Sequence, residues 1–431
     1  MTQPPIAPRL AALGLALGVP LAAVPARAEP TVPTAAVDPK DGAPASPAKP
    51  LDAERMEYAG FPILAGNTDI GVMFGGAATI THFHGDDRPY QWNLDILLAT
   101  SLKHDFGGTR FVQQNQVLRL DLPAFFGGRA RLDSRASFDR TVNEGYYGLG
   151  DATSAAPAPG ASQVAGRYQF LFEEARWRNI VRVHTSSPLD VTFGLISRWE
   201  NPAVYAATKL AEDRADVLGV RGAFLQTLSG GVMYDTRDSE FITTRGLFYQ
   251  IGVGGTVGSA DGIRYGEAAA VLSHYVPLGG PFLFAERVVG SFQFGNVPFY
   301  DQARGGVFEP QRLFGGENGV RGVPQGRYAG LAKVLSNTEV RAPGPRFSLW
   351  KQRFRLGATA FFDVGRVFSE YAWSTPVDGR GLGLKYGVGG GLFLQWGEAA
   401  IFRLDVAYSP DAVAENPGLP VGIYVSDGLM F

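Results

Sequence analysis

The feature of this sequence that most limits its fold is a recurring alternation of polar and apolar residues between Tyr58 and Phe431. The alternating segments are roughly ten to fifteen residues long and are separated by clusters of turn residues. The clearest case is 353–367. Its polar face holds Arg353, Arg355, Thr359 and Asp363, and its apolar face holds Phe354, Leu356, Ala360, Phe362 and Val364. This pattern predicts strands with one face toward a polar lumen and the other toward lipid, which is typical of an antiparallel transmembrane β-barrel.

The composition supports a membrane protein that crosses with strands. The 431 residues are 45% apolar and only 19% charged, whereas soluble domains carry about 25% charged residues. Outside the N-terminal region, no stretch supplies the roughly 20 apolar residues that a membrane-spanning helix needs. A closed barrel is the other structure that pairs every backbone polar group within lipid. The sequence therefore favours an all-β membrane protein over a helical one.

The N-terminal residues predict export. Arg9 precedes the apolar segment 10–24, and the small residues Ala26 and Ala28 follow it, so residues 1–28 indicate a cleaved signal peptide. A short anchor helix is the alternative, but Pro20 interrupts the segment. Residues 29–57 are rich in proline and alanine and indicate a flexible periplasmic linker. We expect residues 58–431 to form one barrel in the outer membrane of a Gram-negative cell.

Counting turns predicts the number of strands. Short turns rich in Pro, Gly and Asp occur at 85–89, 122–128, 185–188, 235–246, 277–281, 343–349 and 397–398. Longer loops occur at 141–165, 201–219, 296–330, 370–383 and 411–417. In outer-membrane barrels the short turns belong to the periplasmic side and the long loops to the outside. Seven periplasmic turns imply about sixteen strands, with a short first strand near 58–65 and a last strand at 420–431. The loop at 296–330 is then the sixth extracellular loop.

Several motifs point to a family. The longest loop contains Phe-Gly-Gly-Glu-Asn-Gly-Val-Arg-Gly at 314–322, and Phe-Phe-Asp-Val-Gly follows at 361–365. Asp235-Thr236-Arg237-Asp238 with Thr244-Arg245-Gly246, the segment 145–150 and the segment 337–340 belong to the same pattern. Together they resemble the outer-membrane assembly-factor superfamily, which includes BamA, TamA and the two-partner-secretion transporters and is often called bacterial surface antigen.

The resemblance implies a function and a site. It places the tip Val320-Arg321-Gly322 on the sixth loop, folded back into the lumen, with Asp363 on a strand beneath it. It implies a role in insertion or translocation of polypeptide or lipid at the outer membrane. Family members that assemble or export proteins usually carry periplasmic POTRA domains. Only about thirty residues separate the predicted cleavage site from the first strand, too few for such a domain, so we expect a POTRA-less member.

Arg321 and Asp363 are predicted to pair. The alternation places Asp363 on the inward face, where a carboxylate with little water needs a cation or several donors. A guanidinium suits it because it can donate two parallel hydrogen bonds. Glu339 faces inward on the adjacent strand and is a second candidate acceptor. A simple pairing across 343–349 leaves it about seven residues from Asp363, so the prediction rests on Asp363, and an arginine in solvent remains the alternative.

The two ends of the barrel predict a thin seam. The first strand contains Gly60 and Pro62, and proline lacks the amide that a ladder needs. The last strand contains glycine and proline as well, and Asp427 falls on an otherwise apolar face unless a bulge at Gly428 turns it inward. We therefore hypothesise a weak lateral seam.

The terminal aromatic residue looks like a targeting signal. Phe431 shares a face of the last strand with Val421, Ile423, Val425 and Leu429. It resembles the recognition signal by which the barrel assembly machinery inserts outer-membrane barrels.

No catalytic residue, metal or cofactor is predicted. The sequence has no cysteine, which excludes thiol catalysis and zinc thiolates. His82 and His84 lie at a strand end without a third histidine nearby, and interfacial polar residues explain them better than a metal site. The net charge of −2 gives no indication of a nucleic-acid partner. The expected partners are outer-membrane lipid, the barrel assembly machinery for its own insertion and a periplasmic protein, with a monomer favoured. The alternative functions are a passive diffusion pore and a structural or partner-binding barrel.

Overall fold

The computed structural model describes residues 54–84, 90–105, 108–155, 166–186, 188–240, 242–349, 352–396, 400–414 and 420–431. The predicted signal peptide and residues 29–53 of the predicted linker lie outside this part of the chain, as do the predicted turns at 85–89 and 397–398. The Asp427 side chain is also outside it, so its predicted orientation stays a prediction.

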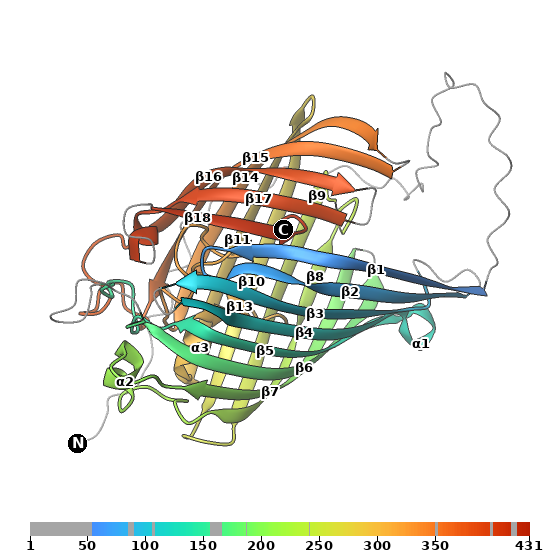
Figure 1. Cartoon of the computed structure of the whole chain (residues 1–431). Coiled ribbons are helices and arrows are strands. Elements are labelled where there is room, and N and C mark those ends of the chain that lie inside the picture. The colour runs from blue at the N-terminus through green and yellow to red at the C-terminus, as the bar shows by residue number, and fades with distance from the viewer. Residues whose placement is uncertain are drawn as a thin grey trace, which may run out of the picture. The chain divides into compact units, whose positions relative to one another are not determined.

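Sixteen antiparallel strands close into one barrel, as the turn count predicts (Figure 1). They are β1 (Glu54–Asn67), β2 (Gly71–His84), β3 (Trp92–Asp105), β4 (Gly108–Ala124), β5 (Ala130–Gly145), β6 (Gln169–Ser186), β7 (Leu189–Ala203), β8 (Ala223–Asp235), β9 (Gly246–Gly258), β10 (Arg264–Gly279), β11 (Phe282–Asn296), β14 (Ala332–Leu349), β15 (Gln352–Phe368), β16 (Lys385–Trp396), β17 (Ala400–Tyr408) and β18 (Val421–Asp427). Consecutive strands pair, and β18 returns to β1. The prediction of an all-β barrel is confirmed.

The connections between strands alternate between the two ends of the barrel. Within the described residues, short helices lie in three of them: α1 (Phe125–Gly128), α2 (Lys209–Asp213) and α3 (Phe299–Gln302), and a 3-10 helix covers Pro410–Ala414. The longest connections, which include 204–222, 297–331 and 369–384, belong to one end, called here the loop end, together with the short connections 68–70 and 259–263. The connections that alternate with them along the chain belong to the other end, called here the turn end. No helix among the described residues is long and apolar enough to span a membrane.

The strands present one face to the interior and one to the outside. On β15, Thr359, Phe361 and Asp363 are buried, whereas Leu356 and Phe362 are exposed. Outward aromatic rings stack across strands near both ends of the wall. Phe347, Phe354 and Trp396 form one row, and Phe362 and Tyr386 form another. Aromatic rows on either side of an apolar band are the mark of a wall that crosses a membrane.

One predicted turn is wrong. Residues 343–349, predicted as a turn, continue β14, and the connection to β15 lies at 350–351. The register shifts between Pro343 and Arg346, so the chain absorbs its prolines in a bulge. The longer strand changes the pairing: Asn337 lies opposite Asp363, and Glu339 lies opposite Phe361. The expected separation of Glu339 from Asp363 is therefore also wrong.

The seam between the first and last strands is short. β1 begins at Glu54, earlier than predicted, and pairs with β2 over fourteen residues. It pairs with β18 only at Gly66 and Asn67, opposite Val425 and Tyr424. In Figure 1, β1 (blue) lies beside β18 (red). The thin seam that the sequence predicts is present.

Candidate functional site

One long connection crosses the interior of the barrel. Residues 297–331, between β11 and β14, contain α3 and a small two-stranded sheet of β12 (Arg304–Gly305) and β13 (Gln311–Arg312). Arg304 contacts Glu174 on β6, whereas Arg321 contacts Asp363 on β15. In the ring of sixteen strands, β6 is seven positions from β15. A segment that touches nearly opposite walls of a closed barrel lies within it.

Arg321 lies at the centre of a buried ionic cluster. Its Nε donates to Oδ2 of Asp363 at 2.7 Å, and its Nη2 donates to Oδ1 at 3.0 Å. The backbone N–H of Arg321 donates to the same carboxylate at 3.1 Å. Nη1 donates to Glu339 at 2.8 Å and to Asp405 at 3.0 Å. The guanidinium also lies 3.4 Å from the centre of the Phe361 ring, so its polar edge and its flat face are both occupied.

Burial makes this arrangement energetically important. The side chains of Arg321, Asp363 and Asp405 are 0% exposed, and Glu339 is 1% exposed. Burial alone would lower the pKa of Arg321, but Asp363 first, then Glu339 and Asp405, outweigh it and hold the pKa above its ordinary value. Removing one partner of such a cluster leaves charges that water cannot reach. The arginine in solvent, the alternative left open by the sequence, does not describe this residue.

Glycines allow the tip to approach the wall. Gly322 has φ +89, and its N–H donates to the hydroxyl of Tyr424 on β18 at 2.8 Å. A Cβ on Gly322 would lie 2.9 Å from the Cβ of Ser409. On β16, a Cβ at Gly387 would overlap the carbonyl oxygen of Arg321. The tip therefore needs glycine both in the loop and in the wall that receives it.

Further cations surround the three carboxylates. Arg341 donates to Glu339 at 2.8 Å, and Arg403 lies 3.1 Å from Asp405. Arg287 donates to Asn337 at 2.8 Å. The amide of Asn337 in turn donates to the carbonyl of Gly319 at 2.9 Å, which holds the backbone just before the tip.

A second ionic cluster holds the base of the segment against the opposite wall. Arg198 on β7 donates to both oxygens of Asp301, at 2.7 and 2.9 Å, and to Glu200 at 2.9 Å. The hydroxyl of Tyr265 donates to Asp301 at 2.7 Å, and Arg304 donates to Glu174 at 2.6 Å. The segment is thus anchored at two places on two walls.

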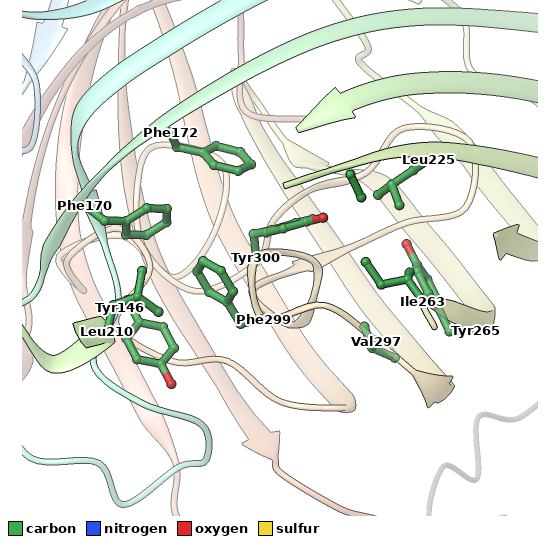
Figure 2. Packing of buried hydrophobic residues seen from close by; sticks show 11 residues of the cluster. Tyr146, Phe170, Phe172, Leu210, Leu225, Ile263, Tyr265, Val297, Phe299 and Tyr300 are labelled. Atoms are coloured by element: carbon green, nitrogen blue, oxygen red, sulfur yellow. The ribbon is translucent and has the colours of Figure 1, made fainter. Parts of the chain in front are cut away.

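An apolar core fills the barrel beside this base. It joins residues of β6, α2, β8, β10 and α3 and of the connections beside them: Tyr146, Phe170, Phe172, Leu210, Ala223, Leu225, Ile263, Tyr265, Val297, Phe299 and Tyr300. Figure 2 shows Phe170 and Phe172 facing Phe299 and Tyr300, with ring centres 5.3 Å apart for Phe170 and Phe299 and 5.4 Å apart for Phe172 and Tyr300. This core holds the first turn of the segment by burial as well as by charge.

The predicted turn at 235–246 forms a local structure at the turn end. Arg237 donates to Asp235 at 2.7 Å, and Asp238 accepts from the backbone N–H groups of Thr244 and Arg245 at 2.9 and 3.3 Å. Gly246 has φ +116. The contacts described for these residues are made within the turn. The turn lies at the turn end of the barrel, whereas 297–331 enters from the loop end.

The face predicted for Phe431 is wrong. β18 ends at Asp427, and Gly428, with φ +80, turns the chain away from the strand. Phe431 packs beside the buried residues Tyr275 and Leu283, and its carbonyl accepts from Arg341 at 2.9 Å. Its ring does not continue the outward face of Ile423 because a glycine breaks the alternation. Its role as an insertion signal stays a prediction.

Sequence reasoning missed several anchoring residues. Asp405 could have been found, since Arg403 and Asp405 alternate with Phe402, Leu404 and Val406 on β17. Asp301 and Arg304 carry no comparable signal, because loop residues have no periodicity. His82 contacts Gln91 at 2.8 Å, and in the described part of the chain no three acidic, histidine or cysteine side chains gather where they could hold a metal ion.

The contact between Gly387 and the tip yields a prediction. Gly387→Ala is expected to displace the tip and to lower the free energy of unfolding by about 1–3 kcal/mol, because a methyl group there overlaps the carbonyl oxygen of Arg321. The rate of proteolysis of the loop would measure the displacement of the tip. The temperature at which the folded band is lost on a gel of unboiled protein would measure the loss of stability. The matched control is Gly255→Ala, where a Cβ meets nothing within 4 Å. Equal behaviour of the two variants would contradict a tightly seated tip.

These features define a class: closed antiparallel membrane barrels whose lumen contains a long loop, anchored to the wall through a buried arginine. Residues 181–426 match the model of the Omp85 superfamily domain, and the chain belongs to this superfamily. Membership confirms the resemblance found in the motifs and implies the outer membrane as its location. No curated protein matches the chain.

Solved structures share the fold. BamA from Haemophilus ducreyi lacking POTRA domains 1–3 is 14% identical with a TM-score of 0.53, over 87% of this chain and 70% of that one. CdiB from Escherichia coli is 14% identical with a TM-score of 0.54, over 88% and 64%. CdiB from Acinetobacter baumannii is 14% identical with a TM-score of 0.50, over 87% and 66%. The match spans only about two thirds of each of these chains.

Proposed function

We propose that this barrel inserts or translocates polypeptide at the outer membrane by opening sideways between β1 and β18, while the segment 297–331 keeps the lumen plugged. The observation that carries the proposal is the two-residue pairing of these strands. Family membership supports it, and lipid remains a second substrate class.

The edge of β1 is built to accept another strand. β1 has fourteen residues and β18 has seven, so β18 cannot cover the edge. Residues 54–65 pair with β2 on one side, and no described strand pairs with their other side. Unpaired N–H and C=O groups in a row are a template for an incoming strand. Tyr58 and Leu64 on this strand are 72% and 67% exposed.

The plug argues against a passive pore. A diffusion pore needs a continuous polar path, whereas 297–331 contacts nearly opposite walls and brings buried apolar residues between them. Transport through the wall at the seam does not require this segment to leave.

A disulfide across the seam tests the proposal. In the register of the two paired positions, Ala65 comes next opposite Ser426, and the chain has no cysteine of its own. We expect Ala65→Cys with Ser426→Cys, when oxidised, to lose the ability to fold an added unfolded outer-membrane barrel into lipid vesicles. Reduction is expected to restore it.

The control places a disulfide within an established pair. Tyr58→Cys with Ile80→Cys joins β1 to β2, which are already paired there, and is expected to retain activity when oxidised. Full activity of the oxidised seam variant would rule out lateral opening.

A further inference from the structure

The outer wall carries a groove over β8, β9 and β10 near the loop end. Outward residues that line it include Leu195, Gln226, Leu228, Gly255, Val257 and Arg264. Its floor is Gly255, where a Cβ would meet nothing within 4 Å. Leu228, opposite Gly255 in the register, is 70% exposed and forms one side. The missing side chain at Gly255 leaves a depression beside the apolar side chains of Leu228 and Val257.

A cation stands at the end of this groove. Arg264 is exposed at the first position of β10, in register with Val257 and Gln226. No ion pair or hydrogen bond to its guanidinium is found among the described residues. The next outward row toward the loop end holds Trp199 opposite Phe224, and aromatic side chains of this kind lie at the level of lipid headgroups. Arg264 is therefore an unpaired cation beside the headgroup layer.

We propose that this groove binds one membrane lipid, with an acyl chain over Gly255 and an anionic phosphate headgroup on Arg264. The groove opens on the lipid-facing wall of an outer-membrane barrel, so hydrocarbon is the medium that fills it. Arg264 supplies the charge complementarity that selects an anionic headgroup. The site lies on β7–β10, on a different part of the wall from the seam, and does not depend on lateral opening.

Lipid retention measures the site. Purified full-length protein, exchanged into detergent with phosphatidylglycerol or phosphatidylcholine, is examined by native mass spectrometry. We expect one retained phosphatidylglycerol and less phosphatidylcholine. Gly255→Leu fills the groove and is expected to reduce retention about tenfold, since it excludes about two methylene groups. Arg264→Gln is expected to reduce it about fivefold and to remove the preference for the anionic lipid.

Matched controls separate the groove from the general surface. Ala270→Leu adds the same side chain on the outward face of β10, opposite Ile251, and Arg380→Gln removes an exposed charge from the loop 369–384. Both are expected to retain the lipid, and a heat-dependent gel shift confirms that each variant is folded. The proposal would be overturned if Gly255→Leu retained as much phosphatidylglycerol as the unaltered protein. It would also be overturned if the unaltered protein retained phosphatidylcholine as well as phosphatidylglycerol. Displacement of the lipid by inorganic phosphate would overturn it too, because a headgroup-only site does not use the groove.

Discussion

Arg321→Ala is expected to release the tip of the lumen segment and to lower the free energy of unfolding by about 3–5 kcal/mol. The substitution leaves Asp363, Glu339 and Asp405 buried without their shared cation. The melting temperature of the unboiled gel band and the rate of proteolysis within 315–326 measure the two effects. The control is Arg380→Ala, at an exposed position of another loop. It is expected to change the free energy of unfolding by no more than about 0.5 kcal/mol and to leave the rate of proteolysis within 315–326 unchanged.

A double-mutant cycle isolates the pair. Asp363 accepts three hydrogen bonds from Arg321, so Arg321→Ala and Asp363→Ala together should cost much less than the sum of the single changes. Asp363→Asn keeps the shape and removes the charge, which separates packing from electrostatics. Additivity within about 0.5 kcal/mol would mean that the two residues do not act together.

Removing the tip is expected to open the lumen. A Cβ on Gly315 would overlap the carbonyl oxygen of Pro324, so the two ends of the tip lie together and a deletion within 315–326 can close without strain. The deletion keeps the base anchor at Asp301 and Arg304. In planar bilayers we expect brief or no openings for the intact protein and a steady conductance for the deletion variant.

A second variant separates the tip's bulk from its anchor. Replacing 316–323 with glycine and serine keeps the length but removes Arg321, and is expected to give a flickering conductance. A large steady conductance of the intact protein would instead favour the passive diffusion pore.

The sequence was informative wherever strand periodicity applied. Alternation placed Asp363 and Glu339 on the inward face, and turn counting placed Arg321 in the sixth connection at its end of the barrel. These inferences work because a strand has a fixed period of two and a barrel alternates its connections. They also explain why the wall could be predicted better than its contents.

Register and loop contacts lay beyond this reasoning. Pro343 and Pro345 favour a turn in the sequence, but the chain accommodates them in a bulge, and the resulting register sets Glu339 opposite Phe361, two residues from Asp363. Asp301 meets Arg198, and Arg304 meets Glu200, from about a hundred residues away in the chain, and no local pattern encodes such contacts. Phe431 left its expected face because a single glycine turns the chain.

The hydrogen bond from Gly322 to Tyr424 links the seating of the tip in the lumen to the opening of the seam between β1 and β18. Tyr424 belongs to β18, one side of the proposed seam, and Gly322 belongs to the seated tip. If outward movement of β18 breaks this bond, a seated tip disfavours the open seam, and an open seam disfavours the seated tip by the same free energy. A polypeptide that captures the edge of β1 would thereby loosen the loop from a distance, and the loop's protease sensitivity would report on substrate engaged at the wall.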